Sequence, residues 1–216
     1  MTGDERREQI IRTAVEVFSK HGFSGTTTKR IAEAAGISEA IIFRHFASKD
    51  ELYEAILHNK VCEGGGKQFP WMGNEPLESA MERADDHEVF YLLALEALRK
   101  HQADSNFMRL IFYAALEDNE ASELFVNQLM EQLYRFLGDY IERRQKDGAM
   151  TNVNPRIVVR AFMGMLIHHS LNNILWDKNR KLLDISNEEA AKNFAEILLR
   201  GVLVGGEPDT AINERS

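Results

Sequence analysis

Apolar residues recur three and four positions apart along almost the whole chain, which is the spacing of one face of a helix. The first such stripe consists of Ile11, Ala14, Val15 and Phe18. It ends in a cationic turn and a glycine, Lys20 to Gly22, which are signals that close a helix. No stretch shows the sustained alternation of a β-strand, and no internal repeat is present. The pattern predicts an all-α protein.

Two short helices joined by a tight turn are predicted within residues 26–46. Thr27 suits the N-cap of the first helix, and Gly36 suits the left-handed position that ends it. Ser38 suits the N-cap of the second helix, and Ile37 fills the corner between the two. The residues expected on the inner side are Ile31, Ala32, Ala35, Ile42, His45 and Phe46. This is the pattern of a helix-turn-helix, which presents its second helix to the major groove of DNA, although any helical hairpin with a glycine turn would share it.

The surroundings of this stretch favour the DNA-binding interpretation. Downstream, Ser48 to Glu51 form a capping box that opens a fourth helix over residues 49–60. Its apolar face carries Leu52, Ala55 and Ile56. Together with the first helix and the helix-turn-helix, it predicts a compact four-helix unit within residues 1–60.

One ordered set of residues runs through this unit: Phe18, Gly22, Phe23, Thr26, Thr27, Ile31, Ala32, Ala35, Gly36, Ser38, Phe43, His45, Phe46, Lys49 and Leu52. Spread over residues 8–56, the set closely resembles the DNA-binding domain of the TetR family of transcriptional regulators. Two positions depart from the family pattern. Phe43 stands where tyrosine is common, and Arg30 stands where an acidic residue often completes a helix cap. The resemblance implies a DNA-binding regulator whose remaining helices bind a ligand and form a dimer.

The helical pattern is broken at residues 62–76, where glycine and proline are frequent. We interpret this segment as a boundary between domains, with Phe69, Trp71 and Met72 packed against a neighbour; a mobile flap is the alternative. Further helices are predicted over residues 86–102, after Asp104, from Asn119 to Gly148, from Pro155, and from a capping box at Ser186 to Glu189. The expected domains are residues 1–60 for DNA binding and 61–204 for effector binding and dimerisation, with a disordered tail over 205–216.

The helix that begins at Pro155 is apolar nearly all round, because Arg160 is the one charged residue between Ile157 and Ile167. Such a helix must be buried on most sides. Gly164 in this helix and Gly201 in the last helix each cost about 1 kcal/mol relative to alanine, which is sensible where another helix approaches closely. Burial against the same helices of a second copy explains both features. We therefore expect a homodimer, as the family resemblance also implies.

The net charge of −8 first argues against DNA binding, but its distribution does not. Residues 1–60 carry 9 Lys or Arg and 9 Asp or Glu, whereas residues 61–216 carry 17 and 25. Within residues 20–49, 5 basic side chains accompany 2 acidic ones, a modest phosphate-binding surface that points to two copies acting together.

The remaining composition indicates a cytoplasmic protein. The single cysteine, Cys62, suits a reducing compartment, and no secretory signal precedes the first helix. Polar residues interrupt the most apolar stretch, residues 157–176, so we expect no membrane span.

Base reading is expected from the N-terminal turn of the second helix of the motif, because that turn enters the groove. Glu39 would accept a hydrogen bond from cytosine N4, Ala40 or Ile41 would touch a thymine methyl, and Arg44 would reach a guanine or a phosphate. Ser38 is either a further contact or a plain N-cap. The resemblance places further residues near the DNA backbone: Thr27, Lys29, Phe43, His45 and Lys49. For His45, burial in the helix crossing is the alternative.

A ligand cavity is the second candidate site. His168, Asn172 and Trp176 share a helical face at a spacing of four, and they line either a cavity or the seam of a dimer. Phe90, Phe112 and Tyr113 complete the candidate ligand set, with a place in the core as the simpler interpretation of each.

The sequence shows no glycine-rich phosphate loop, no nucleophile elbow and no HExxH pattern, so we expect neither enzymatic activity nor a cofactor. The expected function is a DNA-binding transcriptional regulator, a repressor that releases its operator when a small apolar molecule binds the C-terminal domain. One alternative is a DNA-binding regulator with no small-molecule effector. The other is an all-α enzyme that kept a helix-turn-helix.

Overall fold

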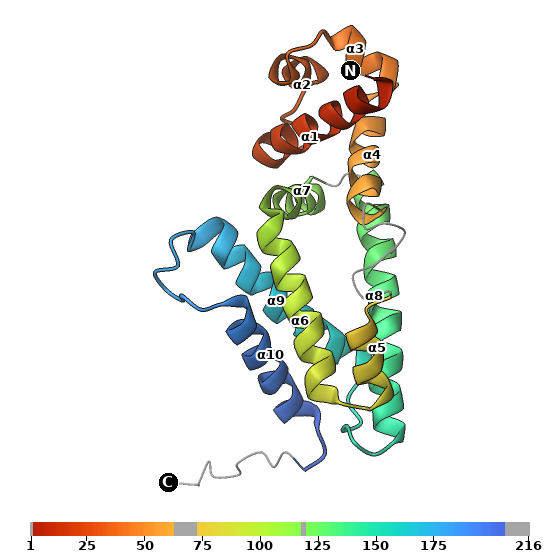
Figure 1. Ribbon diagram of the computed structural model, residues 1–216, viewed down its shortest axis with the longest axis vertical. Coiled ribbons are helices and arrows are strands. Elements are labelled where there is room, and N and C mark those ends of the chain that lie inside the picture. The colour runs from red at the N-terminus through yellow and green to blue at the C-terminus, as the bar shows by residue number, and fades with distance from the viewer. Residues whose placement is uncertain (1, 63–72, 118–119, 206–216) are drawn as a thin grey trace. The chain divides into compact units, whose positions relative to one another are not determined.

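The computed structural model describes residues 2–62, 73–117 and 120–205, and these residues are mainly helical (Figure 1). The helices are α1 (Gly3–His21), α2 (Thr28–Ala35), α3 (Glu39–His45), α4 (Lys49–Cys62), α5 (Glu75–Glu82), α6 (Asp86–Ala103), α7 (Ser105–Leu116), α8 (Glu120–Lys146), α9 (Pro155–Leu171), the π-helical segment η1 (Asn172–Trp176) and α10 (Asn187–Val202). The described part of the chain contains no strand beyond an isolated bridge between Met150 and Leu203. The predicted all-α class is confirmed.

The helices group into two compact units. Unit 1 comprises Met1–Phe69 and Asp104–Met130, and unit 2 comprises Pro70–Ala103 and Glu131–Ser216. Helix α7 therefore groups with the four N-terminal helices, although its sequence position lies in the predicted C-terminal domain. The predicted domain bounds divide the chain by function rather than by packing, and they stay a prediction.

The core of unit 1 is built around three aromatic rings. Phe18 of α1 and Tyr53 of α4 are almost fully buried and meet edge to face, with ring centroids 5.0 Å apart. Phe23, from the turn after α1, lies 5.9 Å from Phe18 and 5.1 Å from Tyr53. The inner residues of α2, α3 and α7 pack on the same core, including Ile31, Ile42, Phe46 and Leu110, all at most 1% exposed. Burial of such side chains is the main force that holds these short helices together.

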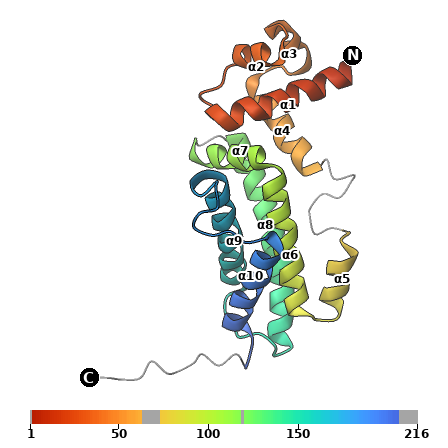
Figure 2. The same cartoon turned by 60° about the vertical axis from the view of Figure 1, so that its left-hand side comes forward.

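In unit 2, helices α6, α9 and α10 pack side by side, and α5 packs on α6 (Figures 1 and 2). Phe90 of α6 and Phe162 of α9 meet edge to face with centroids 5.1 Å apart, and both rings are almost fully buried. The ring centroid of Tyr140, from α8, lies 6.5 Å from that of Phe90. These three rings join α6, α8 and α9 into one apolar core.

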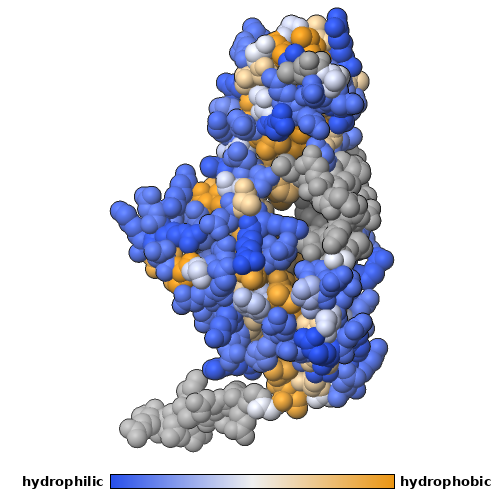
Figure 3. Space-filling model, viewed as in Figure 1, coloured by the Kyte–Doolittle hydropathy of each residue, from blue (hydrophilic) through white to orange (hydrophobic). Residues whose placement is uncertain are grey.

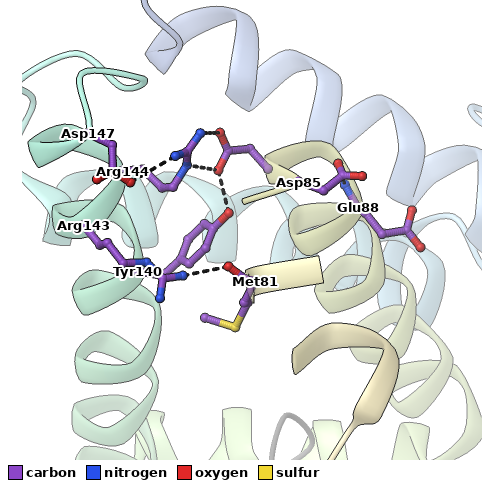
Figure 4. Close-up of polar contacts among 8 residues, drawn as sticks. Met81, Asp85, Glu88, Tyr140, Arg143, Arg144 and Asp147 are labelled. Atoms are coloured by element: carbon purple, nitrogen blue, oxygen red, sulfur yellow. Dashed lines mark hydrogen bonds and ion pairs between the residues drawn. The ribbon is translucent and has the colours of Figure 1, made fainter. Parts of the chain in front are cut away.

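A buried ion pair joins the start of α6 to the end of α8 (Figure 4). Arg144 donates from Nε to one carboxylate oxygen of Asp86 at 2.9 Å and from an Nη to the other at 3.1 Å, and the Tyr140 hydroxyl donates to the same carboxylate at 2.6 Å. Burial, followed by the bond to Asp86, raises the pKa of Tyr140. Loss of one partner from a buried pair typically costs about 3–5 kcal/mol, because the other charge is left uncompensated.

Two local features differ from the sequence-based expectation. The break predicted over residues 62–76 ends earlier, because Pro76 lies in the first turn of α5, where Asn74 caps the helix by accepting from the Leu77 N–H. A proline at this position costs little because its missing N–H would have had no partner within the helix. The helix from Pro155 also loosens into a π-helical segment over Asn172–Trp176. The predicted packing of Phe69, Trp71 and Met72 lies outside the described residues, and so does the predicted tail over residues 205–216, apart from Gly205.

Helix α9 is buried on one side only within the single chain. Val159, Phe162 and Leu166 face the core, whereas Ile157 is 54% exposed and a Cβ on Gly164 would meet no atom within 4 Å. A mostly hydrophilic surface is also interrupted by hydrophobic residues around the segment from η1 to α10 (Figure 3). Its most exposed apolar residues are Trp176, Leu182 and Leu183. Within the described residues, none of the helices combines the length and the apolar character needed to cross a membrane.

Candidate nucleic-acid interface

The turn between α2 and α3 is closed by the residues predicted for it. The Thr27 hydroxyl accepts from the Arg30 N–H at 3.2 Å and so caps α2. Gly36 adopts the left-handed conformation (φ 67°, ψ 34°), and its N–H bonds back to the end of α2. Ile37 donates to the Ala32 carbonyl at 3.0 Å and packs against the unit 1 core. The helix-turn-helix expected from the sequence is confirmed.

Helix α3 divides cleanly into an inner and an outer face. Ile42 is fully buried, and Phe46, which directly follows the helix, is 1% exposed. On the opposite side Ala40, Phe43 and Arg44 are exposed, with Phe43 at 49%. The other predicted contacts of this helix, Glu39, Ile41 and His45, are half-buried. An exposed apolar and cationic face on a firmly packed helix is suited to the edges of bases.

Ser38 has the backbone conformation of an N-cap, but its side chain makes no capping hydrogen bond. Ser38 is thus the N-cap of α3 by position, as predicted, and it lies exposed at the start of the helix. The DNA contact expected of this residue stays a prediction. Helix α3 is instead stabilised at this end by Glu39, whose carboxylate lies in the first turn of the helix.

The Glu39 side chain has a hydrogen-bond partner in α2 that the sequence did not indicate. The hydroxyl of Thr28, the first residue of α2, donates a hydrogen bond to its carboxylate. The bond links the first residues of α2 and α3 across the turn. The same carboxylate was expected to read a cytosine, so base reading by Glu39 would require it to share or release Thr28.

Basic residues are distributed along both helices of the motif and around it. Lys29 is exposed beside Thr27 at the start of α2, and Arg44 is exposed on α3. Arg30 instead donates to the Gly25 carbonyl at 3.0 Å and so helps to hold the turn before α2. Lys49 Nζ donates to the carbonyls of Phe23 at 2.9 Å and Thr26 at 3.1 Å. The ammonium of Lys49 therefore already has two acceptors within the protein. The phosphate contact expected of this residue stays a prediction.

The predicted ligand residues fall in both units. Phe112 and Tyr113 lie half-buried on α7 in unit 1, and the other four belong to unit 2. There, Phe90 is fully buried in the core, as the simpler interpretation held. His168 and Trp176 lie at the surface with ring centroids 6.2 Å apart, and the Asn172 side chain donates to the His168 carbonyl at 2.8 Å. Ligand binding by these residues stays a prediction.

Unit 2 also contains two partly buried contacts between polar side chains that the sequence analysis missed. His101 Nδ1 lies 2.8 Å from the Ser170 hydroxyl, and His169 Nε2 lies 3.0 Å from the Asn173 side chain. Burial lowers the pKa of His101 to about 4, and burial, followed by the charge of Arg180, lowers the pKa of His169. Both imidazoles are therefore neutral at neutral pH. The two partners, Ser170 and Asn173, lie in α9 and η1, and the sequence around them does not indicate these contacts.

A hollow of about 380 Å³ in unit 1 is lined by a mixed set of side chains: Glu8, Ile11, Arg12, Val15, Glu16, Asn59, Asp104 and Asn106. None of them belongs to the predicted ligand set. Three or more His, Cys, Asp or Glu side chains arranged to hold a metal ion do not occur among the described residues.

Comparison with known proteins agrees with the geometry of the N-terminal helices. Residues 10–56 match the family described as bacterial regulatory proteins, tetR family. The chain is 26% identical over 182 residues to YerO, an uncharacterized HTH-type transcriptional regulator of Bacillus subtilis (strain 168), in a match that spans 79% of this chain and 59% of YerO. It is also 27% identical over 178 residues to the nucleoid occlusion factor SlmA of Vibrio cholerae, in a match that spans 79% of this chain and 84% of SlmA.

The crystal structure of AibR in complex with isovaleryl coenzyme A and operator DNA is similar to the whole fold. The TM-score is 0.63 at 18% sequence identity, over 90% of this chain and 98% of AibR. At this identity the similarity shows the fold, in which a helix-turn-helix domain precedes a helical C-terminal part.

Proposed function

Because this chain belongs to the tetR family of bacterial regulatory proteins and is a DNA-binding transcriptional regulator, we propose that it is a homodimeric repressor of the cytoplasm. In this proposal, each copy reads one half of an operator with α3. A small apolar molecule bound by the C-terminal helices then releases the DNA. The proposal includes no catalytic step.

The observation that carries the proposal is the division of α3 into a buried and an exposed face. Ile42 anchors the helix in the core, while Ala40 and Arg44 face outward. An arginine can donate two hydrogen bonds to guanine O6 and N7, and a small apolar side chain fits against a thymine methyl. We assign base reading to Ala40, Ile41 and Arg44, with Ser38 and Glu39 at the entry of the helix.

Positioning on the DNA backbone is assigned to the start of α2. Thr27 and Lys29 are exposed there, beside the N-terminal N–H groups of the helix. Such groups suit phosphate oxygens, which fix the register of a protein on DNA without reading its sequence. We assign further contacts with the DNA backbone to Phe43 and His45 of α3.

Dimerisation is supported by the apolar face that α9 and α10 leave uncovered. Ile157 of α9 is 54% exposed and Ile197 of α10 is 61% exposed. Gly164 and Gly201 lie on these two helices with open space where a Cβ would stand, so another helix could approach closely at both positions. A second copy would bury this face and would supply the second reading head that a weakly basic surface needs.

The effector part of the proposal rests on an analogy. AibR, a protein of the same fold, was crystallised with isovaleryl coenzyme A and operator DNA, so this architecture accommodates both kinds of partner. One observation favours the alternative without an effector: Phe90, a candidate ligand contact, is fully buried in the unit 2 core. To decide between the two, acyl coenzyme A thioesters are the first compounds to test, because AibR was crystallised with one of them and they carry an apolar group.

Selection of DNA from a random-sequence pool by the full-length protein tests the proposal. We expect enrichment of a near-palindrome whose half-sites lie on one face of the duplex. Acyl coenzyme A thioesters of increasing chain length are then titrated into the complex with the enriched duplex. Release of DNA by one of them supports the effector, while tight binding that none of them alters favours the alternative without one. Failure to enrich any sequence would contradict the proposed function.

A further inference from the structure

The turn that joins α1 to α2, residues 22–26, is held from both sides by charged side chains from other helices. Gly22 ends α1 with φ 69° and ψ 178°, a conformation open essentially to glycine alone. Inside the turn, the buried Thr26 hydroxyl donates to the Gly22 carbonyl at 2.7 Å. The turn ends directly before Thr27, the N-cap of α2, so its geometry sets where the helix-turn-helix begins.

Lys49, the first residue of α4, holds the carbonyl side of this turn. Its ammonium donates to the carbonyls of Phe23 and Thr26 and lies 3.9 Å from the centroid of the Phe23 ring. A cation over the face of an aromatic ring is attracted by the ring's quadrupole. The ammonium is thus bound by two carbonyls and one ring of the same turn.

Glu117, at the C-terminal end of α7, holds the N–H side. Its Oε2 accepts from the Phe23 N–H at 2.6 Å and from the Ser24 N–H at 3.3 Å. A carboxylate at the C-terminus of a helix is unfavourable for the helix dipole, so this position needs a compensating partner. The two backbone N–H groups supply it.

The absence of a side chain at Gly22 makes room for this carboxylate. A Cβ at this position would stand 2.2 Å from Oε1 of Glu117 and 2.9 Å from Cδ. Glycine is therefore required twice here, once by its backbone conformation and once by the space that Glu117 occupies.

Helix α7 is itself fixed on the DNA-binding helices, so the position of Glu117 is defined. Leu110 is fully buried in the unit 1 core, and Phe107 and Ile111 pack against the same core. The Tyr53 hydroxyl of α4 also reaches the Leu110 carbonyl at 3.4 Å. Any shift of the C-terminal turn of α7 would move the carboxylate relative to Phe23 and Ser24.

We propose that Glu117 is a positioning residue for DNA recognition, acting with Lys49 as a two-sided clamp on the turn between α1 and α2. The clamp fixes α2 and α3 on α1 in the arrangement that reads DNA. Displacement of α7 that withdraws the carboxylate leaves two N–H groups without this acceptor and lets the helix-turn-helix shift. This inference rests on the proposed DNA-binding function and adds a point of control to it.

The test compares Glu117→Ala and Glu117→Gln with Glu54→Gln in the full-length protein. Glu54 is an exposed glutamate of α4, so its substitution controls for the loss of one negative charge. Affinities are measured for the duplex enriched by the wild type and for a scrambled duplex of equal length and composition. Hydrogen exchange is followed at the Phe23 and Ser24 amides.

We expect Glu117→Ala to bind the enriched duplex about tenfold more weakly than Glu54→Gln does, because charge-assisted bonds to two N–H groups are lost. Binding to the scrambled duplex should stay within about twofold, with an unchanged dependence on salt, since no phosphate contact is removed. The Phe23 and Ser24 amides should exchange faster than in the control. Glu117→Gln should be intermediate, because its amide oxygen accepts without a charge.

Equal affinities of Glu117→Ala and Glu54→Gln for the enriched duplex would overturn the inference, and so would an equal loss on both duplexes. If Glu117→Ala does not fold, the isosteric Glu117→Gln decides by the same criteria. If the wild type enriches no sequence, the proposed function fails. The exchange rates of the two amides then still decide whether the carboxylate clamps the turn, and unchanged rates would reject the clamp.

Discussion

Thr28 donates a hydrogen bond to Glu39, and this bond joins the first residue of α2 to the first residue of α3. Glu39 therefore has a structural partner at the position from which a base would be read. Glu39→Gln should keep a weaker bond to Thr28, whereas Glu39→Ala removes it. We expect Glu39→Ala to change base preference at one pair of symmetric operator positions, with a cost of about 1–3 kcal/mol at the preferred base.

Selection of DNA by Glu39→Ala and Thr28→Val checks this expectation. Thr28→Val removes the hydroxyl but leaves the carboxylate, so it should lower affinity without changing the preferred base. A change of preference with Thr28→Val alone would mean that the bond, and not the carboxylate, sets the reading.

Substitution of Lys49 distinguishes a structural role within the protein from a contact with DNA. Its ammonium is bound to two carbonyls of the α1–α2 turn, so Lys49→Ala should lower the free energy of unfolding by about 1–2 kcal/mol. If this turn is the only partner of the ammonium, the slope of log affinity against log salt should not change. A slope reduced by about 0.9 with unchanged stability would instead identify a phosphate contact. Lys29→Ala, at an exposed position on α2, is the matched control and should reduce the slope.

The sequence was sufficient for the parts of the DNA-binding helices that depend on near neighbours. Thr27 and Gly36 act within four residues of themselves, so capping rules locate both. The partner of the Phe23 N–H could not be predicted from the sequence, because Glu117 lies 94 positions further along the chain. The predicted break ran as far as residue 76 because proline occurs both in turns and at the start of helices, and the capping Asn74 distinguishes the two. The His101–Ser170 contact spans 69 positions and likewise has no local signal.

The half-buried His101 makes the stability of the fold sensitive to acid. Burial lowers the pKa of His101 from 6.5 to about 4, so between these values the unfolded chain binds a proton that the folded chain does not. Stability should therefore fall as pH decreases from 6.5 towards 4, by about 3 kcal/mol in total for this group. Chemical unfolding at several pH values measures the effect. His101→Asn should flatten the dependence.

The proposed dimer can be tested without disturbing the core. Ile197 is 61% exposed on α10, so Ile197→Glu should not lower the stability of a single chain, but it would bury a charge in the proposed interface. Sedimentation should show a dimer for the wild type at micromolar concentration and a monomer for the variant. Lys192→Glu, at an exposed position on another side of α10, should remain a dimer. A monomeric wild type would contradict the proposed interface.

Base reading by the exposed face of α3 can be measured by comparing the sequences that the wild type and Arg44→Ala select from one random pool. Arg44 is exposed beside the buried anchor Ile42, so its truncation should leave the fold intact. We predict that the wild type enriches a near-palindrome and that Arg44→Ala loses base preference at one symmetric pair of positions while it keeps the rest. Identical preferences for the two proteins, or enrichment of no sequence by the wild type, would contradict this prediction.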